Sequence, residues 1–245
     1  MDVVFIKVGG SLITDKKTGD FRINFKVIDQ ISEDIKEIID EIRVILAHGA
    51  GTYGHRPVKE YGLQDGLDGK VLEASEVLHM VRILNNAVVG RLIYNGVPAV
   101  GVSPRSFIAW DDGHKYFLKQ IETMLSWGFV PVTHGDVVFS KESGARIVSA
   151  DEIPLILSEI ISKAVFFTDA PGVLDEEGKV LREVNRGSRI LKADAGIDVT
   201  GGMLGKVERA LKLAELGVDV VITSYENKGD LLRALRGEKG TRVTR

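Results

Sequence analysis

The 245-residue sequence has no cysteine, which excludes disulfides and thiolate metal sites. It has no apolar run near the ~18 residues that a membrane span needs. Its net charge of −3 gives no general attraction to nucleic acid or to an anionic membrane. Met1 leads directly into a strand-like segment, without the basic and apolar regions of a secretory signal. We therefore expect a cytoplasmic protein that binds neither nucleic acid nor membrane.

What the chain does have is a regular alternation of short apolar runs and longer amphipathic segments. The expected strands are 3–6, 44–46, 97–102, 129–133, 165–168 and 218–223. The expected helices are 28–39, 77–92, 118–125, 153–161 and 206–216, and hairpins are expected at 137–148 and 173–180. This alternation is typical of an α/β sandwich around a mostly parallel sheet. We divide the chain into two lobes, residues 1–130 and 131–245.

Residues 48–55 place three glycines between two histidines, directly after the expected strand at 44–46. Glycines let the backbone approach a ligand and point its N–H groups at an anion, so phosphate is the expected ligand. The spacing matches the dinucleotide fingerprint, but no second strand ending in an acidic residue follows, which argues against a dehydrogenase. His55, beyond the last glycine, is placed to donate to a phosphate oxygen. For His48 a structural role in the loop remains open.

A second glycine turn, Gly9-Gly10-Ser11, follows Lys7 at the end of the first expected strand. Such a turn can wrap phosphates, and ammonium groups can neutralise charge during phosphoryl transfer. The alternative is a tight turn with two solvated lysines, Lys7 and Lys16. Lys7 ends an otherwise apolar strand, and a charge at the edge of a core usually has a partner. That position favours a functional role.

A third glycine-rich segment, residues 198–206, leads into an expected helix and contains Gly202 and Lys206. Helix N-termini attract phosphate. The segment is not a Walker A loop, because its glycine spacing is one residue short and Val207 replaces the Ser or Thr that would hold magnesium.

Acidic residues complete the candidate set. Asp151 precedes an expected helix and is either an N-cap or the group that orients two lysines. Asp169 follows a buried strand and is a candidate for a nucleotide side. Gly135-Asp136 is another strand-end turn, and His134 is given a minor role. His79 and His114 are assigned to structure or surface, and no cluster has zinc-like spacing, so no metal ligands are predicted.

Together these segments resemble the amino acid kinase superfamily along essentially the whole chain. Two details are similar to the isopentenyl phosphate kinases: Lys16 stands nine positions after Lys7, and His55 closes a His-Gly-x-Gly-x-aromatic-Gly-His segment. Fosfomycin-inactivating kinases share much of that pattern. Ala50, Ala150 and Pro171 depart from residues common in the subfamily.

The resemblance implies a three-layer αβα sandwich in which lobe 1–130 binds isopentenyl phosphate and lobe 131–245 binds ATP. It implies phosphorylation of isopentenyl phosphate with ATP and Mg²⁺, and a homodimer. It implies catalytic roles for Lys7, Lys16, His55 and Lys206. On the acceptor side it places Ala50, Gly51, His55 and Ala150. On the nucleotide side it places Lys7, Gly9, Gly10, Ser11, Gly51, Asp169, Gly202 and Lys206, with Asp151 as the organising carboxylate.

An isopentenyl tail needs an apolar slot, for which Met80, Val81, Leu84 and Ile147 are candidates, although a place in the core is the favoured alternative for each. Two other functions are weighed: a fosfomycin-type or other small-molecule kinase of the same superfamily, and a non-catalytic nucleotide-binding module. The three lysines argue against the module, since nucleotide binding alone needs no second cationic grip on the γ-phosphoryl group.

Overall fold

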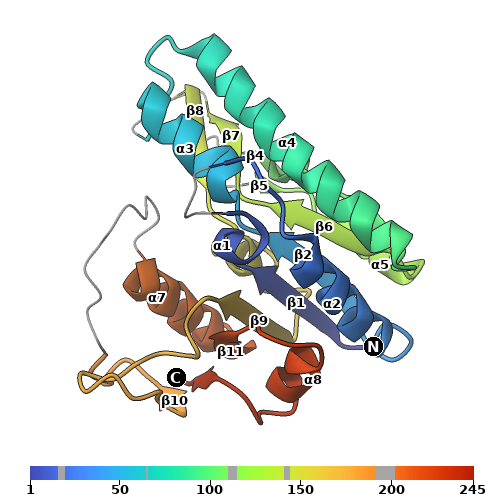
Figure 1. Ribbon diagram of the computed structural model, residues 1–245, viewed down its shortest axis with the longest axis vertical. Coiled ribbons are helices and arrows are strands. Elements are labelled where there is room, and N and C mark those ends of the chain that lie inside the picture. The colour runs from blue at the N-terminus through green and yellow to red at the C-terminus, as the bar shows by residue number, and fades with distance from the viewer. Residues whose placement is uncertain (16–19, 65, 110–114, 141–143, 191–201) are drawn as a thin grey trace.

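The computed structural model describes residues 1–15, 20–64, 66–109, 115–140, 144–190 and 202–245. Its centre is an eight-stranded sheet with the strand order β10–β12–β11–β9–β1–β2–β6–β3 (Figure 1). The strands of this sheet are β1 (Val3–Val8), β2 (Arg43–His48), β3 (Ala99–Gly101), β6 (Val130–His134), β9 (Lys163–Thr168), β10 (Glu183–Val184), β11 (Asp219–Ser224) and β12 (Thr241–Val243). Adjacent strands from β11 to β3 pair in parallel, and β12 pairs antiparallel with β11. The predicted mostly parallel sheet is confirmed.

Helices cover both faces of this sheet. The helices are α1 (Gly10–Ile13), α2 (Phe25–Lys36), α3 (Gly51–Tyr61), α4 (Val71–Tyr94), α5 (Lys119–Ser126), α6 (Ile153–Ile156), α7 (Gly202–Glu215) and α8 (Asp230–Leu235). Side chains alternate across a strand, so in β1 Val4 and Ile6 pack with α2, α4 and α8, whereas Phe5 packs with α5, α6 and α7. The result is the expected three-layer αβα sandwich.

Two shorter β-structures lie outside the central sheet. β7 (Asp136–Ser140) and β8 (Gly144–Val148) form an antiparallel hairpin, as predicted for 137–148. β4 (Ile108–Ala109) and β5 (Lys115–Tyr116) form a second antiparallel pair after the 3₁₀ turn η1 (Pro104–Ser106). The hairpin predicted at 173–180 is reduced to a single bridge between Leu174 and Val180.

Two predictions of local structure are wrong. Residues 51–55 do not form a loop, because α3 begins at Gly51 and includes His55 and Pro57. The helix predicted at 153–161 is limited to α6, after which the chain turns towards β9. Pro154 lies in the first turn of α6, where its missing N–H costs no hydrogen bond. The following Leu157 and Ile161 are buried in the core without continuing the helix.

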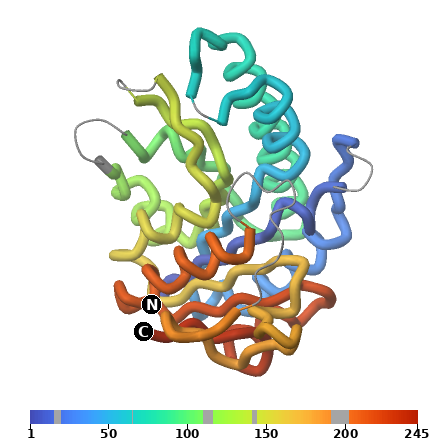
Figure 2. Tube along the Cα trace, turned by 90° about the vertical axis from the view of Figure 1, so that its left-hand side faces the viewer, coloured from blue at the N-terminus to red at the C-terminus, as the bar shows by residue number. Residues whose placement is uncertain are grey.

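A small apolar cluster stands apart from the two main core layers. It is built from α3, α4 and the β7–β8 hairpin, with Val58, Val77 and Val137 among its buried members. Figure 1 shows α3, the hairpin and the first part of α4 together beyond one end of the sheet, and Figure 2 shows the hairpin and the two helices rising from the same side of it. This cluster forms one wall of the site described below.

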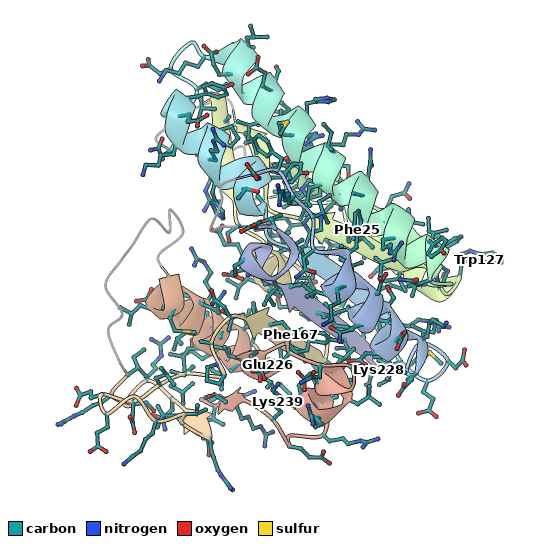
Figure 3. The ribbon with its side chains drawn as sticks, viewed as in Figure 1. Phe25, Trp127, Phe167, Glu226, Lys228 and Lys239 are labelled. Atoms are coloured by element: carbon teal, nitrogen blue, oxygen red, sulfur yellow. The ribbon has the colours of Figure 1, made fainter. Side chains whose placement is uncertain are left out.

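Aromatic residues fill part of the remaining core of the sandwich. Phe167 of β9 is fully buried and meets the ring of Tyr225 edge-to-face, with 4.9 Å between centroids. Figure 3 places Phe167 in the interior and Trp127, which follows α5, at the outer edge. None of the helices in the described part of the chain has the length and apolar character that a membrane span requires.

Candidate active site

The site lies at one edge of the sheet, where four neighbouring parallel strands end. These strands are β9, β1, β2 and β6, and each leads into a turn. Backbone hydrogen bonds join the turns to the adjacent strands: Gly9 N donates to Phe167 O (2.9 Å), Gly49 N to Val8 O (2.9 Å) and Gly135 N to His48 O (3.1 Å). The carboxyl edge of a parallel sheet is where α/β proteins bind ligands.

Two of the glycine turns touch each other. A Cβ at Gly10 would lie 2.5 Å from Gly51 N, and one at Gly49 would lie 2.6 Å from Gly10 N. Any side chain at either position would therefore force the turns apart. Glycine serves here to bring two turns together, as well as to leave the backbone open to a ligand.

A buried carboxylate joins two lysines from distant parts of the chain. Asp151 Oδ1 is 2.8 Å from Lys7 Nζ at the end of β1, and Lys206 Nζ in α7 donates to Asp151 Oδ2 at 2.7 Å. The three residues are 5–8% exposed. Of the two roles left open for Asp151, the structure shows the contact with both lysines, and no side-chain cap bond is formed at α6.

For Lys7 and for Asp151, burial shifts the pKa in one direction and the oppositely charged neighbour shifts it in the other. Burial lowers the pKa of Lys7 to about 8, with Asp151 opposing the change and Lys206 adding to it. Burial alone would raise the pKa of Asp151, but the two ammonium groups outweigh it and hold that pKa well below its ordinary range. With all three groups charged the cluster carries a net charge of +1, which suits it to hold an anion.

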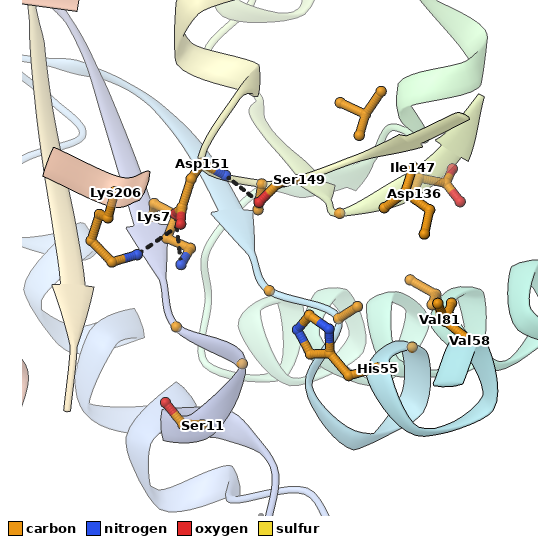
Figure 4. Close-up of a pocket in the computed structure, with 18 of the residues that line it drawn as sticks. Lys7, Ser11, His55, Val58, Val81, Asp136, Ile147, Ser149, Asp151 and Lys206 are labelled. Atoms are coloured by element: carbon orange, nitrogen blue, oxygen red, sulfur yellow. Dashed lines mark hydrogen bonds and ion pairs between the residues drawn. The ribbon is translucent and has the colours of Figure 1, made fainter. Parts of the chain in front are cut away.

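His55 shares one cavity with these lysines (Figure 4). It comes from the first turns of α3 and lies between the charged cluster and an apolar end of the cavity. The predicted site residues that line this cavity are Lys7, Gly9, Gly10, Ser11, Ala50, His55, Ala150, Asp151, Asp169, Gly202 and Lys206. Gly51 is buried against Thr14 and is not among the lining residues, and Lys16 lies outside the described residues, as does His114.

The apolar end is formed by side chains from α3, α4 and the hairpin. Val58, Val77, Val81, Val137 and Ile147 line it. Of the four candidates for a tail slot, Val81 and Ile147 lie here. Leu84 is fully buried between α4 and the sheet, and Met80 packs against the same core layer, so these two are core residues.

Three valines of the apolar end, Val58, Val77 and Val137, were not identified as candidates from the sequence. Val58 belongs to the helix that was mistaken for a loop, and Val77 shares an apolar stripe with core positions of α4. Val137 was seen only as part of a hairpin. A usable signal was the expected hairpin itself, because residues paired across a hairpin share a face and Val137 pairs with the tail-slot candidate Ile147.

Asp136 is an unexpected charge in the cavity wall. Its side chain is fully buried, with Arg105 Nη1 2.6 Å from Oδ2. Burial raises the pKa of Asp136 to about 6, against the lowering effect of Arg105. No group of three histidine or carboxylate side chains within the described ranges is arranged to hold a metal ion.

Fold and cavity together define a three-layer α/β protein with a cationic cavity at the carboxyl edge of its sheet. Residues 2–224 match the model of the amino acid kinase family. The chain belongs to the amino acid kinase family.

Its relatives include isopentenyl phosphate kinases from two organisms. The enzyme of Methanocaldococcus jannaschii is 31% identical over 98% of both chains, and that of Haloferax volcanii is 34% identical over 87% of this chain and 89% of its own. A crystal structure of an isopentenyl phosphate kinase superposes with a TM-score of 0.83 at 27% identity, over 99% of this chain and all of that one. These matches cover 87–99% of this chain.

Proposed function

We propose that the protein transfers the γ-phosphoryl group of ATP to the phosphate of isopentenyl phosphate, giving isopentenyl diphosphate and ADP. One observation carries this proposal: a single cavity joins a buried lysine–carboxylate–lysine cluster to an apolar end, with His55 between them. A substrate with a phosphate head and a hydrocarbon tail matches both ends. The similarity to two isopentenyl phosphate kinases supports the same choice.

On the acceptor side, we assign the phosphate to His55 and to the backbone of Ala50, Gly51 and Ala150. The tail then occupies the apolar end. We assign residues 1–130 to the lobe that binds the acceptor and residues 131–245 to the lobe that binds ATP. The hairpin residues Val137 and Ile147, although in the second range, contribute to the wall of the tail site.

On the nucleotide side, Lys7, Lys16 and Lys206 hold the transferring phosphoryl group. Gly9, Gly10 and Gly202 line the phosphate path, together with Ser11, and Asp169 contacts the nucleotide. Gly202 and Met203 begin α7, whose N-terminal end adds a positive potential where the phosphates would lie. Asp151 keeps two of the ammonium groups charged and in place.

The proposed reaction needs no strong general base. An oxygen of the acceptor phosphate, already ionised at neutral pH, forms a bond to the γ-phosphorus while the bond to the bridging oxygen of ADP breaks. The main obstacle is to bring two polyanions together. Cations and N–H dipoles fixed in a water-poor cavity reduce that repulsion, and removing one such contact typically costs 10²–10³ in rate.

Magnesium is proposed as part of the nucleotide substrate. Mg²⁺ is commonly held by one or two carboxylates, substrate phosphates and water, so the described residues need no three-carboxylate cage to accept it. Asp169, on the cavity wall, is the carboxylate available for such a role. From the family resemblance we also propose a homodimer and a cytoplasmic location, and light scattering of the purified protein measures the first.

The test is a panel of acceptors incubated with protein and MgATP, with ADP release as the readout. We expect ADP release to be much faster with isopentenyl phosphate than with fosfomycin or N-acetylglutamate. Mass spectrometry should then detect isopentenyl diphosphate as the product. Preference for fosfomycin would replace the proposed acceptor with a small polar phosphonate. Absence of ADP release with every acceptor, despite nucleotide binding, would favour a non-catalytic binding module.

A further inference from the structure

Two buried histidines lie directly before turns that line the cavity, and the proposed reaction does not use them. His48 and His134 end the neighbouring strands β2 and β6, in register with each other. Their rings are stacked, with 5.6 Å between centroids, and the two residues are 1% and 0% exposed. Each precedes a glycine that lines the cavity, Gly49 or Gly135. Their burial keeps them from touching a ligand, so any role is exerted through their neighbours.

The hydrogen bonds of His48 determine its tautomer. Its Nδ1 lies 3.1 Å from Gly49 O, and a carbonyl oxygen only accepts, so Nδ1 carries the proton. Its Nε2 then accepts from Asn85 Nδ2 at 3.1 Å. Burial lowers the pKa of His48 to about 3, and the nearby His134 contributes to that change. His48 is therefore neutral at physiological pH, with one fixed donor and one fixed acceptor.

The hydrogen bond from His48 to Gly49 O also determines the direction of the Ala50 N–H. A trans peptide is planar, and its N–H points away from its C=O. Because the Gly49 carbonyl points towards the buried His48 ring, the N–H of Ala50 points the opposite way, to the side where Gly49 and Ala50 line the cavity. A Cβ at Gly135 would lie 3.9 Å from Ala50 N and 3.3 Å from Ala150 N, so these two amides flank one small region.

We propose that His48 is a positioning residue for the acceptor phosphate: its Nδ1–H holds the Gly49–Ala50 peptide so that the Ala50 amide faces the cavity. Glycine at position 49 leaves this peptide free to rotate, and the His48 bond selects one orientation. The assignment of the ligand as an acceptor phosphate rests on the proposed function, whereas the orientation of the peptide does not.

His134 provides an internal comparison. Its Nδ1 lies 3.0 Å from Gly135 O, so it holds its own turn in the same manner. The peptide that follows leads into β7 of the hairpin, where Asp136 pairs with Val148. His134 is as buried as His48 and makes the same kind of bond, but its turn leads into β7, whereas the turn held by His48 begins α3.

The decisive experiment compares two substitutions of similar polarity. In His48→Asn the side-chain amide N–H can replace the Nδ1–H donor to Gly49 O. In His48→Gln the longer amide reaches the position of Nε2 and retains a partner in Asn85, but leaves Gly49 O without its donor. Crystal structures of the two unliganded variants report the orientation of the Gly49–Ala50 peptide directly. We expect it to be kept in His48→Asn and to be rotated or split between orientations in His48→Gln.

Kinetics then test the consequence for the phosphate. We expect His48→Gln to raise KM for isopentenyl phosphate about tenfold, less than the loss that follows removal of a backbone donor, with KM for ATP changed less than about twofold. His48→Asn should restore most of the acceptor KM, and His134→Gln should leave it near the wild-type value. Retention of the peptide orientation in His48→Gln, or equal acceptor KM for His48→Asn and His48→Gln, would overturn the inference.

The experiments distinguish a failure of the proposed function from a failure of the positioning role. A wild-type protein that does not use isopentenyl phosphate refutes the acceptor, while a rotated Gly49–Ala50 peptide in His48→Gln and a retained one in His48→Asn would still establish the positioning role.

Discussion

Asp151 and Lys7 form a buried ion pair 2.8 Å long between the end of β1 and the segment that precedes α6. The same carboxylate also binds Lys206, so it is the only counter-charge that the described contacts give to two buried ammonium groups. Replacing it therefore leaves like charges facing each other in a region of low dielectric.

We predict that Asp151→Asn lowers the free energy of unfolding by about 3–5 kcal/mol, the usual cost of removing one member of a buried ion pair. Urea denaturation followed by circular dichroism measures the change. Glu177→Gln is the matched control, because the Lys179–Glu177 pair is as short, 2.7 Å, but lies on the surface. Its loss should cost less than about 1 kcal/mol. Equal effects of the two substitutions would contradict a special role for the buried carboxylate.

The acceptor role of His55 gives a second prediction. We expect His55→Ala to weaken binding of isopentenyl phosphate far more than binding of ATP, since the imidazole lies between the cationic cluster and the apolar end. Isothermal titration with each ligand separates the two affinities. His79→Ala, at an exposed position of α4, is the histidine control and should change neither. A parallel loss of both affinities would show that His55 does not belong to the acceptor side.

A third prediction concerns Lys16, which is placed near the transferring phosphoryl group by resemblance alone. We expect Lys16→Ala to lower kcat about 10²–10³-fold, as loss of one charge-stabilising contact usually does, while nucleotide affinity changes much less. Steady-state ADP release and ATP titration measure the two effects. Lys26→Ala, an exposed lysine on α2, controls for the loss of one positive charge. Unchanged kcat in Lys16→Ala would remove this lysine from the catalytic set.

Part of the cationic half of the cavity was predictable because parallel strands bring their carboxyl ends to one edge. Lys7 ends β1 and Asp169 follows the adjacent strand β9, so their proximity follows from the sheet. Asp151 follows the separate hairpin and Lys206 lies in α7, so their arrival at this edge depends on the tertiary fold. The orientation of His55 required the helix α3, which local propensity opposes: Gly51, Gly54 and Pro57 all disfavour a helix.

Tertiary packing is what overrides that propensity. Tyr53 and Val58 of α3 are buried, and at Gly54 a Cβ would lie 3.2 Å from Val81 Cγ2 of α4. The glycine thus permits two helices to approach, a contact between segments that no local pattern reveals. The same error concealed Val58, and with it the extent of the apolar end.

The apolar end supplies a fourth prediction. Ile147→Ala removes side-chain carbons from its wall, so we expect KM for isopentenyl phosphate to rise about fourfold for each carbon that contacts the tail, the equivalent of about 0.8 kcal/mol per CH₂. KM for a short-chain alkyl phosphate should change little, because such an acceptor does not reach this wall. Ile93→Ala, an exposed isoleucine of α4 that does not line the cavity, is the control. A uniform change for long and short acceptors would place the tail elsewhere.

The buried histidines predict how stability depends on pH. Burial lowers the pKa of His48 to about 3 and that of His134 to about 4, below the ordinary value near 6.5. As the pH falls from 7 to 5, the unfolded chain binds protons at both positions and the folded protein does not. Stability therefore decreases on acidification, by up to about 2 kcal/mol for each histidine over this interval.

The double variant His48→Asn/His134→Asn should lose correspondingly less stability between pH 7 and pH 5, as measured by urea denaturation at the two pH values. Asp136 acts in the opposite direction, because burial raises its folded pKa to about 6, so the folded protein takes up a proton there first. Both proteins contain Asp136, so its contribution cancels in the comparison. The wild-type protein must lose more stability than the variant if the histidines are neutral and buried; identical losses would mean that they accept protons in the folded state.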